Sequence, residues 1–184
     1  MKKMIFLLTL IFLGSTTLFS LDRLMISVGG NYFAPSDEGY KTIYGKTQFC
    51  PDFKATVRVY NRFFIGIGYG ICVAKGTIPP SNDPTESRLD FLSISAGYRA
   101  PLVGKLIFRI ELGGENVSYK EKAWGEEKSG SSSALRIGGG IDIPVSKILF
   151  GALSFSYANP ESTIDEETIK LGGFKAGVSL GMKF

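Results

Sequence analysis

The sequence contains no histidine among its 184 residues. Histidine is the usual general base near neutral pH and the commonest protein ligand of metal ions. Its absence excludes histidine-dependent hydrolysis and histidine-ligated zinc, and we expect neither an enzyme nor a bound cofactor. Basic residues are also scattered rather than clustered, although the formal charge is +4. Nucleic acid is therefore not an expected partner.

Long apolar runs are equally scarce, and the single candidate lies at the amino terminus. Lys2 and Lys3 precede apolar residues 4–13, and small or polar residues follow. This order is typical of a secretory signal peptide, and the run is shorter than the roughly 20 residues of a transmembrane helix. We predict that residues 1–20 are a signal peptide and that residues 21–184 form the mature domain. An uncleaved anchor is the alternative.

The mature chain is instead dominated by alternation of apolar and polar residues. The alternating segments are 24–32, 53–60, 65–73, 92–99, 106–113, 135–143, 149–157 and 174–184. A period of two indicates strands with one apolar face. The segments are close to the roughly 9–11 residues that a tilted strand needs to cross a bilayer. Without a spanning helix, a closed barrel is the one way to hold this domain in a membrane.

The connections between these segments alternate between long and short. Residues 34–51, 75–87, 120–131 and 159–168 form long connections, whereas 61–62, 100–104 and 144–146 form short ones. Outer-membrane barrels have short periplasmic turns and longer extracellular loops. The sequence therefore predicts an all-β fold, an eight-stranded antiparallel up-and-down transmembrane β-barrel in a bacterial outer membrane. The even number of strands places both termini of the domain in the periplasm.

The composition of the polar face indicates that it lines the lumen. This face is rich in glycine and serine, and it carries charges of both signs, including Lys175. Six of these charges are expected to form a lumen network: Lys54, Arg58, Arg109, Glu111, Arg136 and Asp142. On a lipid face, a central lysine or arginine would cost about 2–4 kcal/mol. Two alternatives remain open, a soluble barrel with the apolar face inward and a narrow pore lined by these charges.

Two segments carry a resemblance to a known family. Residues 174–184 end on the aromatic Phe184 with apolar residues at every second position, and Gly29-Gly30-Asn31-Tyr32-Phe33-Ala34-Pro35-Ser36 forms the first strand. The chain resembles the OmpA/OmpX-like, opacity-type outer membrane β-barrel family. The resemblance implies that Phe184 is an assembly signal read by the barrel-assembly machinery, and that lipid and lipopolysaccharide surround the barrel. Ser179 stands where the family's terminal signal has glycine.

The two cysteines are placed together by the expected pairing of the second and third segments. If Val57 lies opposite Ile65, the same register puts Cys50 opposite Cys72, with both side chains in the lumen. Exported proteins fold in an oxidising environment. We predict a disulfide, with two free thiols as the alternative if the register shifts.

The long connections carry the exposed chemistry. Trp124, the single tryptophan, lies among charged residues and is a candidate contact for a host or cell-surface ligand; the alternatives are an interface anchor or packing on neighbouring loops. The last connection is acidic, with Glu161, Asp165, Glu166 and Glu167, and either collects divalent cations or is simply solvated. We expect a structural or adhesive role through the four long loops, with a narrow channel for small or apolar solutes as the alternative.

Overall fold

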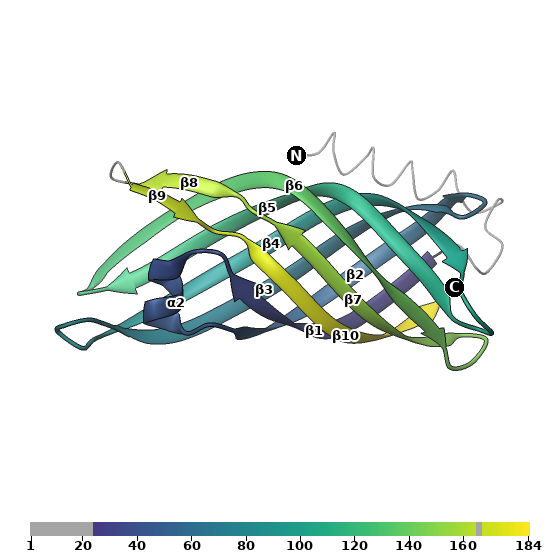
Figure 1. Ribbon diagram of the computed structural model, residues 1–184, viewed down its shortest axis with the longest axis horizontal. Coiled ribbons are helices and arrows are strands. Elements are labelled where there is room, and N and C mark those ends of the chain that lie inside the picture. The colour runs from purple at the N-terminus through teal and green to yellow at the C-terminus, as the bar shows by residue number, and fades with distance from the viewer. Residues whose placement is uncertain (1–23, 165–166) are drawn as a thin grey trace, which may run out of the picture.

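The computed structural model describes residues 24–164 and 167–184. The predicted signal peptide, and Asp165 and Glu166 of the acidic connection, lie outside the described residues. Within them, eight antiparallel strands close into a barrel in the order β1-β10-β7-β6-β5-β4-β3-β2 (Figure 1). The barrel strands are β1 (Leu24–Pro35), β2 (Gln48–Tyr60), β3 (Phe63–Ile78), β4 (Asp83–Pro101), β5 (Ile107–Ala123), β6 (Glu126–Pro144), β7 (Leu149–Ala158) and β10 (Gly173–Lys183).

Three further elements lie in the connections at one end of the barrel. Helix α2 (Glu38–Tyr44) follows β1, and the short strands β8 (Glu161–Ile164) and β9 (Glu167–Lys170) form a separate hairpin between β7 and β10. No helix in the described part of the chain is long and apolar enough for a membrane span. The carboxy terminus lies at the opposite end, with the short turns (Figure 1).

The outer surface of the barrel is aliphatic, as the alternation predicted. Ile94, Leu112 and Val178 point outward and are about 60% exposed or more. A closed barrel that buries its charges and exposes its aliphatic side chains is suited to lipid and not to water. The lumen-facing assignment of the polar residues is therefore confirmed, and the soluble alternative is wrong.

Small residues on the inner face leave room for the charged side chains. A Cβ atom at Gly140 would lie 3.1 Å from Nη2 of Arg109 and would collide with the carbonyl oxygen of Leu153. A Cβ atom at Gly68 would lie 2.7 Å from the hydroxyl of Ser93. An eight-stranded barrel is just wide enough for side chains to fill, so glycine at such positions lets the long cations occupy the middle.

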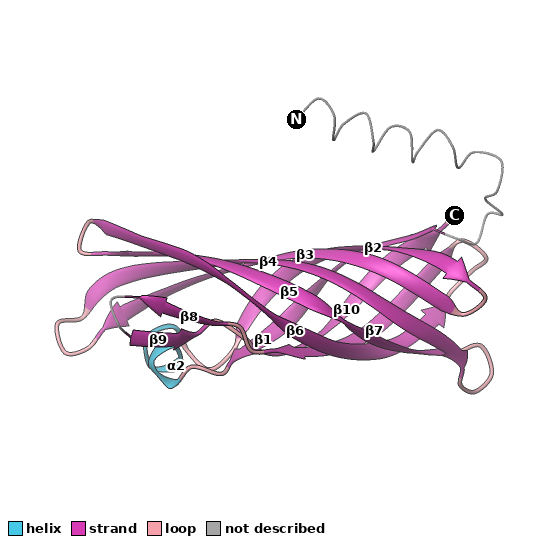
Figure 2. Ribbon diagram, turned by 90° about the horizontal axis from the view of Figure 1, so that it is seen from above, coloured by secondary structure: helices cyan, strands magenta, loops and turns pink. Residues whose placement is uncertain are grey.

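Two of the segments that were predicted to be long loops form paired strands instead. β3 and β4 stay paired as far as Ile78 opposite Asp83, and β5 and β6 stay paired as far as Ala123 opposite Glu126. The four strands therefore continue beyond the membrane as one sheet, here called the projecting sheet (residues 71–91 and 116–135). It extends to the left in Figure 2. Charged residues interrupt the alternation in these extensions, so the sequence did not predict them as strands. Outside lipid, neither face of a strand needs to be apolar.

Candidate functional site

The centre of the lumen is an ion-pair network built around Glu111. Its carboxylate accepts hydrogen bonds from Lys54 of β2 and from Arg136 of β6 (3.1 Å), and it forms an ion pair with Arg109 of its own strand (2.7 Å). The Glu111 side chain is 1% exposed. Three cations thus converge on one buried carboxylate, and four of the predicted charges meet at the centre of the lumen.

Two further carboxylates extend the network along the barrel axis. Asp142 pairs with Arg109 (2.5 Å) and, at 3.2 Å, with Arg99 of β4. Glu115 lies on the other side, where it binds Lys175 of β10 (2.9 Å). The carboxylates and cations alternate through the lumen, so each buried charge faces an opposite one.

Two members of this network were missing from the predicted set: Arg99 and Glu115. Arg99 lies on the polar face of its strand, which was the available signal, whereas Glu115 lies just past the predicted end of its strand. Lys175 was predicted to lie on the lumen face, and its pairing with Glu115 places it in the network. Which charges meet across a lumen depends on strand tilt and closure, and period-two alternation does not specify either. The predicted member Arg58 is separate from the network and lies near the short turns, with Asn61 and Arg62.

Above the network, towards the projecting sheet, the lumen is closed by apolar side chains. Phe33, Leu89, Phe91, Val117 and Tyr119 are buried here, together with the two cysteines. Phe33 and Phe91 pack edge to face with ring centroids 5.3 Å apart. We call these five residues and the cysteines the apolar plug. The ammonium group of Lys175 lies 3.4 Å from the centroid of the Phe91 ring, and so joins the plug to the ion pairs below.

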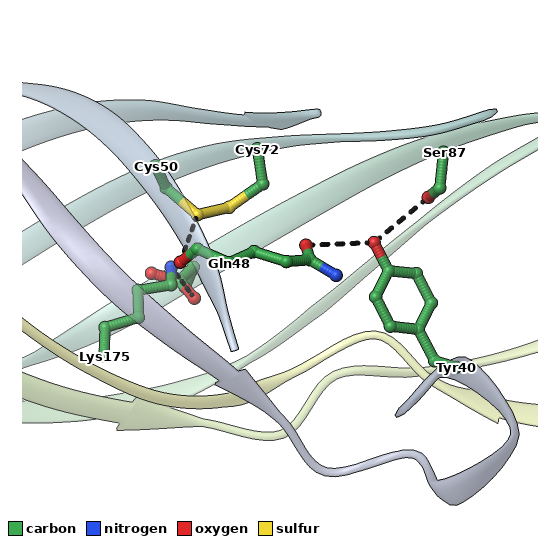
Figure 3. The surroundings of a disulfide bond; sticks show 7 residues. Tyr40, Gln48, Cys50, Cys72, Ser87 and Lys175 are labelled. Atoms are coloured by element: carbon green, nitrogen blue, oxygen red, sulfur yellow. Dashed lines mark hydrogen bonds and ion pairs between the residues drawn. A yellow bond between two sulfur atoms is a disulfide. The ribbon is translucent and has the colours of Figure 1, made fainter. Parts of the chain in front are cut away.

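The predicted disulfide between Cys50 and Cys72 is present in the apolar plug (Figure 3). β2 and β3 have the expected register, with Val57 opposite Ile65. The Cα atoms of the cysteines are 4.5 Å apart, which lies in the range that a disulfide bridges without backbone movement. The bond fixes β2 to the base of the projecting sheet.

Helix α2 covers the plug from the extracellular side. The Asp37 carboxylate caps its first turn by accepting from the backbone N–H of Tyr40 (2.8 Å). The Tyr40 hydroxyl contacts Gln48 and Ser87 at 3.2 Å each, reaching into the barrel above the disulfide (Figure 3). The Tyr44 hydroxyl donates to Glu121 (2.6 Å). Burial raises the pKa of the Tyr44 phenol, so it stays protonated as a donor over the whole physiological range.

The space left between the apolar plug and the ion pairs is small. A polar cavity of about 70 Å³ remains between the plug and the ion pairs, lined in part by Ser27, Asn31 and Ser154. That volume holds a few water molecules. The geometry supports a structural filling of the lumen by charges rather than a conducting pore.

We therefore expect the protein to conduct no measurable ion current across planar lipid bilayers. Insertion of the purified protein should give no steady ohmic steps, because the plug and α2 block one end of the lumen and paired charges fill the middle. Single-channel recording at symmetric high salt measures this directly. A barrel of the same class known to conduct is the positive control, and regular steps from this protein would contradict the filled-lumen description.

Trp124 lies at the tip of the projecting sheet. It occupies the turn between β5 and β6 in a left-handed conformation (φ 51°), followed by Gly125. Its indole Nε1 donates to Asp83 at the tip of the neighbouring hairpin (2.7 Å), yet the residue remains 68% exposed. The contact with the adjoining hairpin was one of the alternatives open from sequence, and it holds the ring in place without burying it.

Phe184 lies at the other end of the barrel, where its backbone pairs with Leu24 (N–O distance 2.8 Å) and its ring is partly exposed. Its role as an assembly signal stays a prediction. No cluster of three or more histidine, cysteine, aspartate or glutamate side chains among the described residues could hold a metal ion.

Eight antiparallel strands, an aliphatic exterior and a lumen filled with ion pairs define a small β-barrel protein of the bacterial outer membrane. No protein-family model matches the sequence, and no curated protein is detectably similar to it. Solved structures of the same class do match its fold.

The outer membrane protein OprG from Pseudomonas aeruginosa has a TM-score of 0.72 at 9% identity, covering 89% of this chain and 96% of that chain. Neisserial surface protein A (NspA) gives 0.63 at 15% identity, covering 88% and 97%. Ail of Yersinia pestis, in complex with the heparin analogue sucrose octasulfate, gives 0.57 at 16% identity, covering 88% and 99%. At these identities the likeness shows the fold alone.

Proposed function

We propose that the protein is an adhesive surface protein that binds a ligand outside the cell through the tip of its projecting sheet, with Trp124 as the principal contact. The observation that carries the proposal is an exposed tryptophan held rigidly far from the membrane. Export with removal of residues 1–20, assembly through Phe184 and contact with lipopolysaccharide around the outer band belong to the same proposal.

The rigidity of the tip supports a binding role. Paired strands bear Trp124, and its hydrogen bond to Asp83 joins the two hairpins. Hydrogen bonds from Ser81 and from Trp124 lower the pKa of the Asp83 carboxyl, so this acceptor stays ionised in neutral surroundings. A preorganised aromatic side chain loses little conformational entropy on binding, and tryptophan is enriched among the residues that dominate binding energy.

The filled lumen favours this role over the channel for small or apolar solutes. It also favours binding over catalysis, because the buried carboxylates and cations neutralise one another and no histidine is available as a base. The Ail structure was solved with a heparin analogue. We therefore include a sulfated polysaccharide among the surfaces on which adhesion is tested.

Replacing Trp124 with alanine should weaken adhesion about 30-fold, the effect expected when a dominant interface tryptophan is truncated. Cells displaying the wild type or Trp124→Ala would be measured on immobilised heparin, on extracellular-matrix glycoproteins and on albumin. Fluorescence of the single tryptophan should change when the wild type binds.

Glu126→Ala, in the same exposed hairpin end, is the matched control and should bind like the wild type. Surface labelling of each variant checks that equal amounts reach the outer membrane, which we expect because Trp124 is mostly exposed. Equal adhesion of wild type and Trp124→Ala, or no adhesion above albumin on any surface, would refute the proposal.

A further inference from the structure

A second cavity opens at the end of the barrel that holds the short turns, on the periplasmic side. Its volume is about 320 Å³. The charged side chains that line it are Arg58, Arg62, Arg99, Lys147, Lys183 and Asp142. Five cations and one carboxylate give this periplasmic mouth an excess of four positive charges. A concave site lined by one sign of charge concentrates counter-ions.

The one carboxylate of the mouth is already occupied. Asp142 pairs with Arg109 and, at 3.2 Å, with Arg99. In residues 24–164 and 167–184, no carboxylate forms an ion pair with Arg58, and Arg62 reaches just the hydroxyl of Tyr98 (3.4 Å). Among the described residues, the excess charge of the mouth is therefore not balanced by ion pairs.

Two of these cations, Arg58 and Lys183, point inward rather than towards lipid, whereas Arg62 and Lys147 are exposed in the turns. Arg58 shares the inner face of β2 with Lys54 and Thr56, four and two residues before it. Lys183 lies opposite Met25, which is 8% exposed and buried in the same end of the lumen. Cations that serve lipid head groups would lie on the outer rim. Arg58 and Lys183 instead face a solute that enters the mouth from the periplasm.

Arg99 forms the floor of the mouth and is held in place. Its guanidinium group lies 4.3 Å from the centroid of the Phe64 ring, and its Nη2 donates to the Thr56 hydroxyl (2.9 Å). Beside this fixed cation, the half-buried Arg58 keeps its donors available. The guanidinium fork matches the oxygens of a phosphate group, with which it forms two parallel hydrogen bonds.

We propose that the periplasmic mouth is an anion-binding site for a small phosphate-bearing solute, with Arg58 as its principal ligand. The volume lies at the lower end of the range for small-molecule pockets, which suits one or two phosphate groups and excludes a polymer segment of any bulk. The site is on the opposite side of the membrane from Trp124 and is independent of the adhesive role.

The test compares the full-length protein, folded in octyl glucoside, with Arg58→Gln, Arg58→Lys and Lys105→Gln. Lys105 is an exposed cation in the turn between β4 and β5, at the same end of the barrel but outside the cavity. Titration calorimetry with inorganic phosphate and with pyrophosphate, against sodium chloride of equal ionic strength, measures binding. Thermal unfolding without phosphate checks that each variant is folded.

We expect Arg58→Gln to bind phosphate at least tenfold more weakly, Arg58→Lys to be intermediate because a lysine retains the charge without the fork, and Lys105→Gln to match the wild type. Without phosphate, Arg58→Gln should be as stable as the wild type or more so, since it relieves repulsion in the mouth. A second arm of the experiment compares the same variants in vesicles that contain phosphatidylglycerol and in vesicles of pure phosphatidylcholine.

The two arms identify the source of the phosphate. Binding of the free anions that depends on Arg58 supports a soluble ligand, and an Arg58-dependent effect confined to phosphatidylglycerol vesicles identifies a lipid head group and overturns the soluble solute. Equal binding by Arg58→Gln and Lys105→Gln in both arms overturns the site altogether, and so does a wild type that responds neither to the free anions nor to phosphatidylglycerol.

Discussion

Replacing Glu111 with glutamine should destabilise the barrel by about 3–5 kcal/mol, the usual cost of removing one partner from a buried ion pair. Lys54, Arg109 and Arg136 all converge on this carboxylate, which is 1% exposed. The amide keeps the shape of the side chain but removes the carboxylate that three cations share. Lys54 loses its ion-pair partner, whereas Arg109 keeps Asp142 and Arg136 keeps Glu115. The midpoint of urea unfolding in phospholipid vesicles, followed by the gel mobility shift of the folded barrel, measures the loss.

Two further variants separate charge from packing in this experiment. Glu86→Gln, an exposed glutamate on the projecting sheet, should change stability by no more than about 0.5 kcal/mol. Adding Lys54→Met to Glu111→Gln should recover at least about 1 kcal/mol, because it removes the cation that has lost its ion-pair partner. If Glu111→Gln unfolds at the same urea concentration as the wild type, the lumen is wet enough to screen its charges and the network does not hold the barrel closed.

Removing the disulfide should have the next largest effect on stability. The bond closes a loop with a sequence separation of 22 residues, and cross-linking a loop of this size stabilises a protein by about 3 kcal/mol through the unfolded state. The double variant Cys50→Ala, Cys72→Ala should still fold, since β2 and β3 remain paired, but its unfolding midpoint should fall accordingly. Unfolding under reducing and non-reducing conditions measures the same difference in the wild type.

The double variant serves as the control for the reductant, because dithiothreitol should not change its midpoint. Alkylation of the folded, non-reduced protein should modify no cysteine. Two modified thiols under those conditions, or equal midpoints for wild type and double variant, would show that the cross-link makes no contribution.

Much of the fold follows from local patterns in the sequence. Alternation located all eight barrel strands, because a strand between lipid and lumen must place apolar and polar residues on opposite faces. The hairpin register of β2 and β3 followed from the tight turn at residues 61–62, and it led directly to the Cys50–Cys72 pair. These features depend on residues near one another in the chain, and so one sequence is enough to predict them.

The alternation failed where lipid no longer constrains the strands. The projecting sheet, α2 and the hairpin of β8 and β9 lie beyond the membrane, where exposed strands and loops have similar compositions. The inner face also mixes two environments that sequence alone did not separate. Val117 and Tyr119 belong to the apolar plug, whereas Glu115, two residues earlier on the same face, belongs to the ion network.

By itself the sequence determined that the chain after residue 23 consists largely of amphipathic strands long enough to cross a bilayer, with the charges on the face away from lipid. The tertiary structure decided which charges meet, where the lumen is closed and where positive charge is left unbalanced at the periplasmic mouth. The physical reason is that alternation is a property of one strand, whereas contacts across the lumen join strands far apart in the chain through the tilt and closure of the whole barrel.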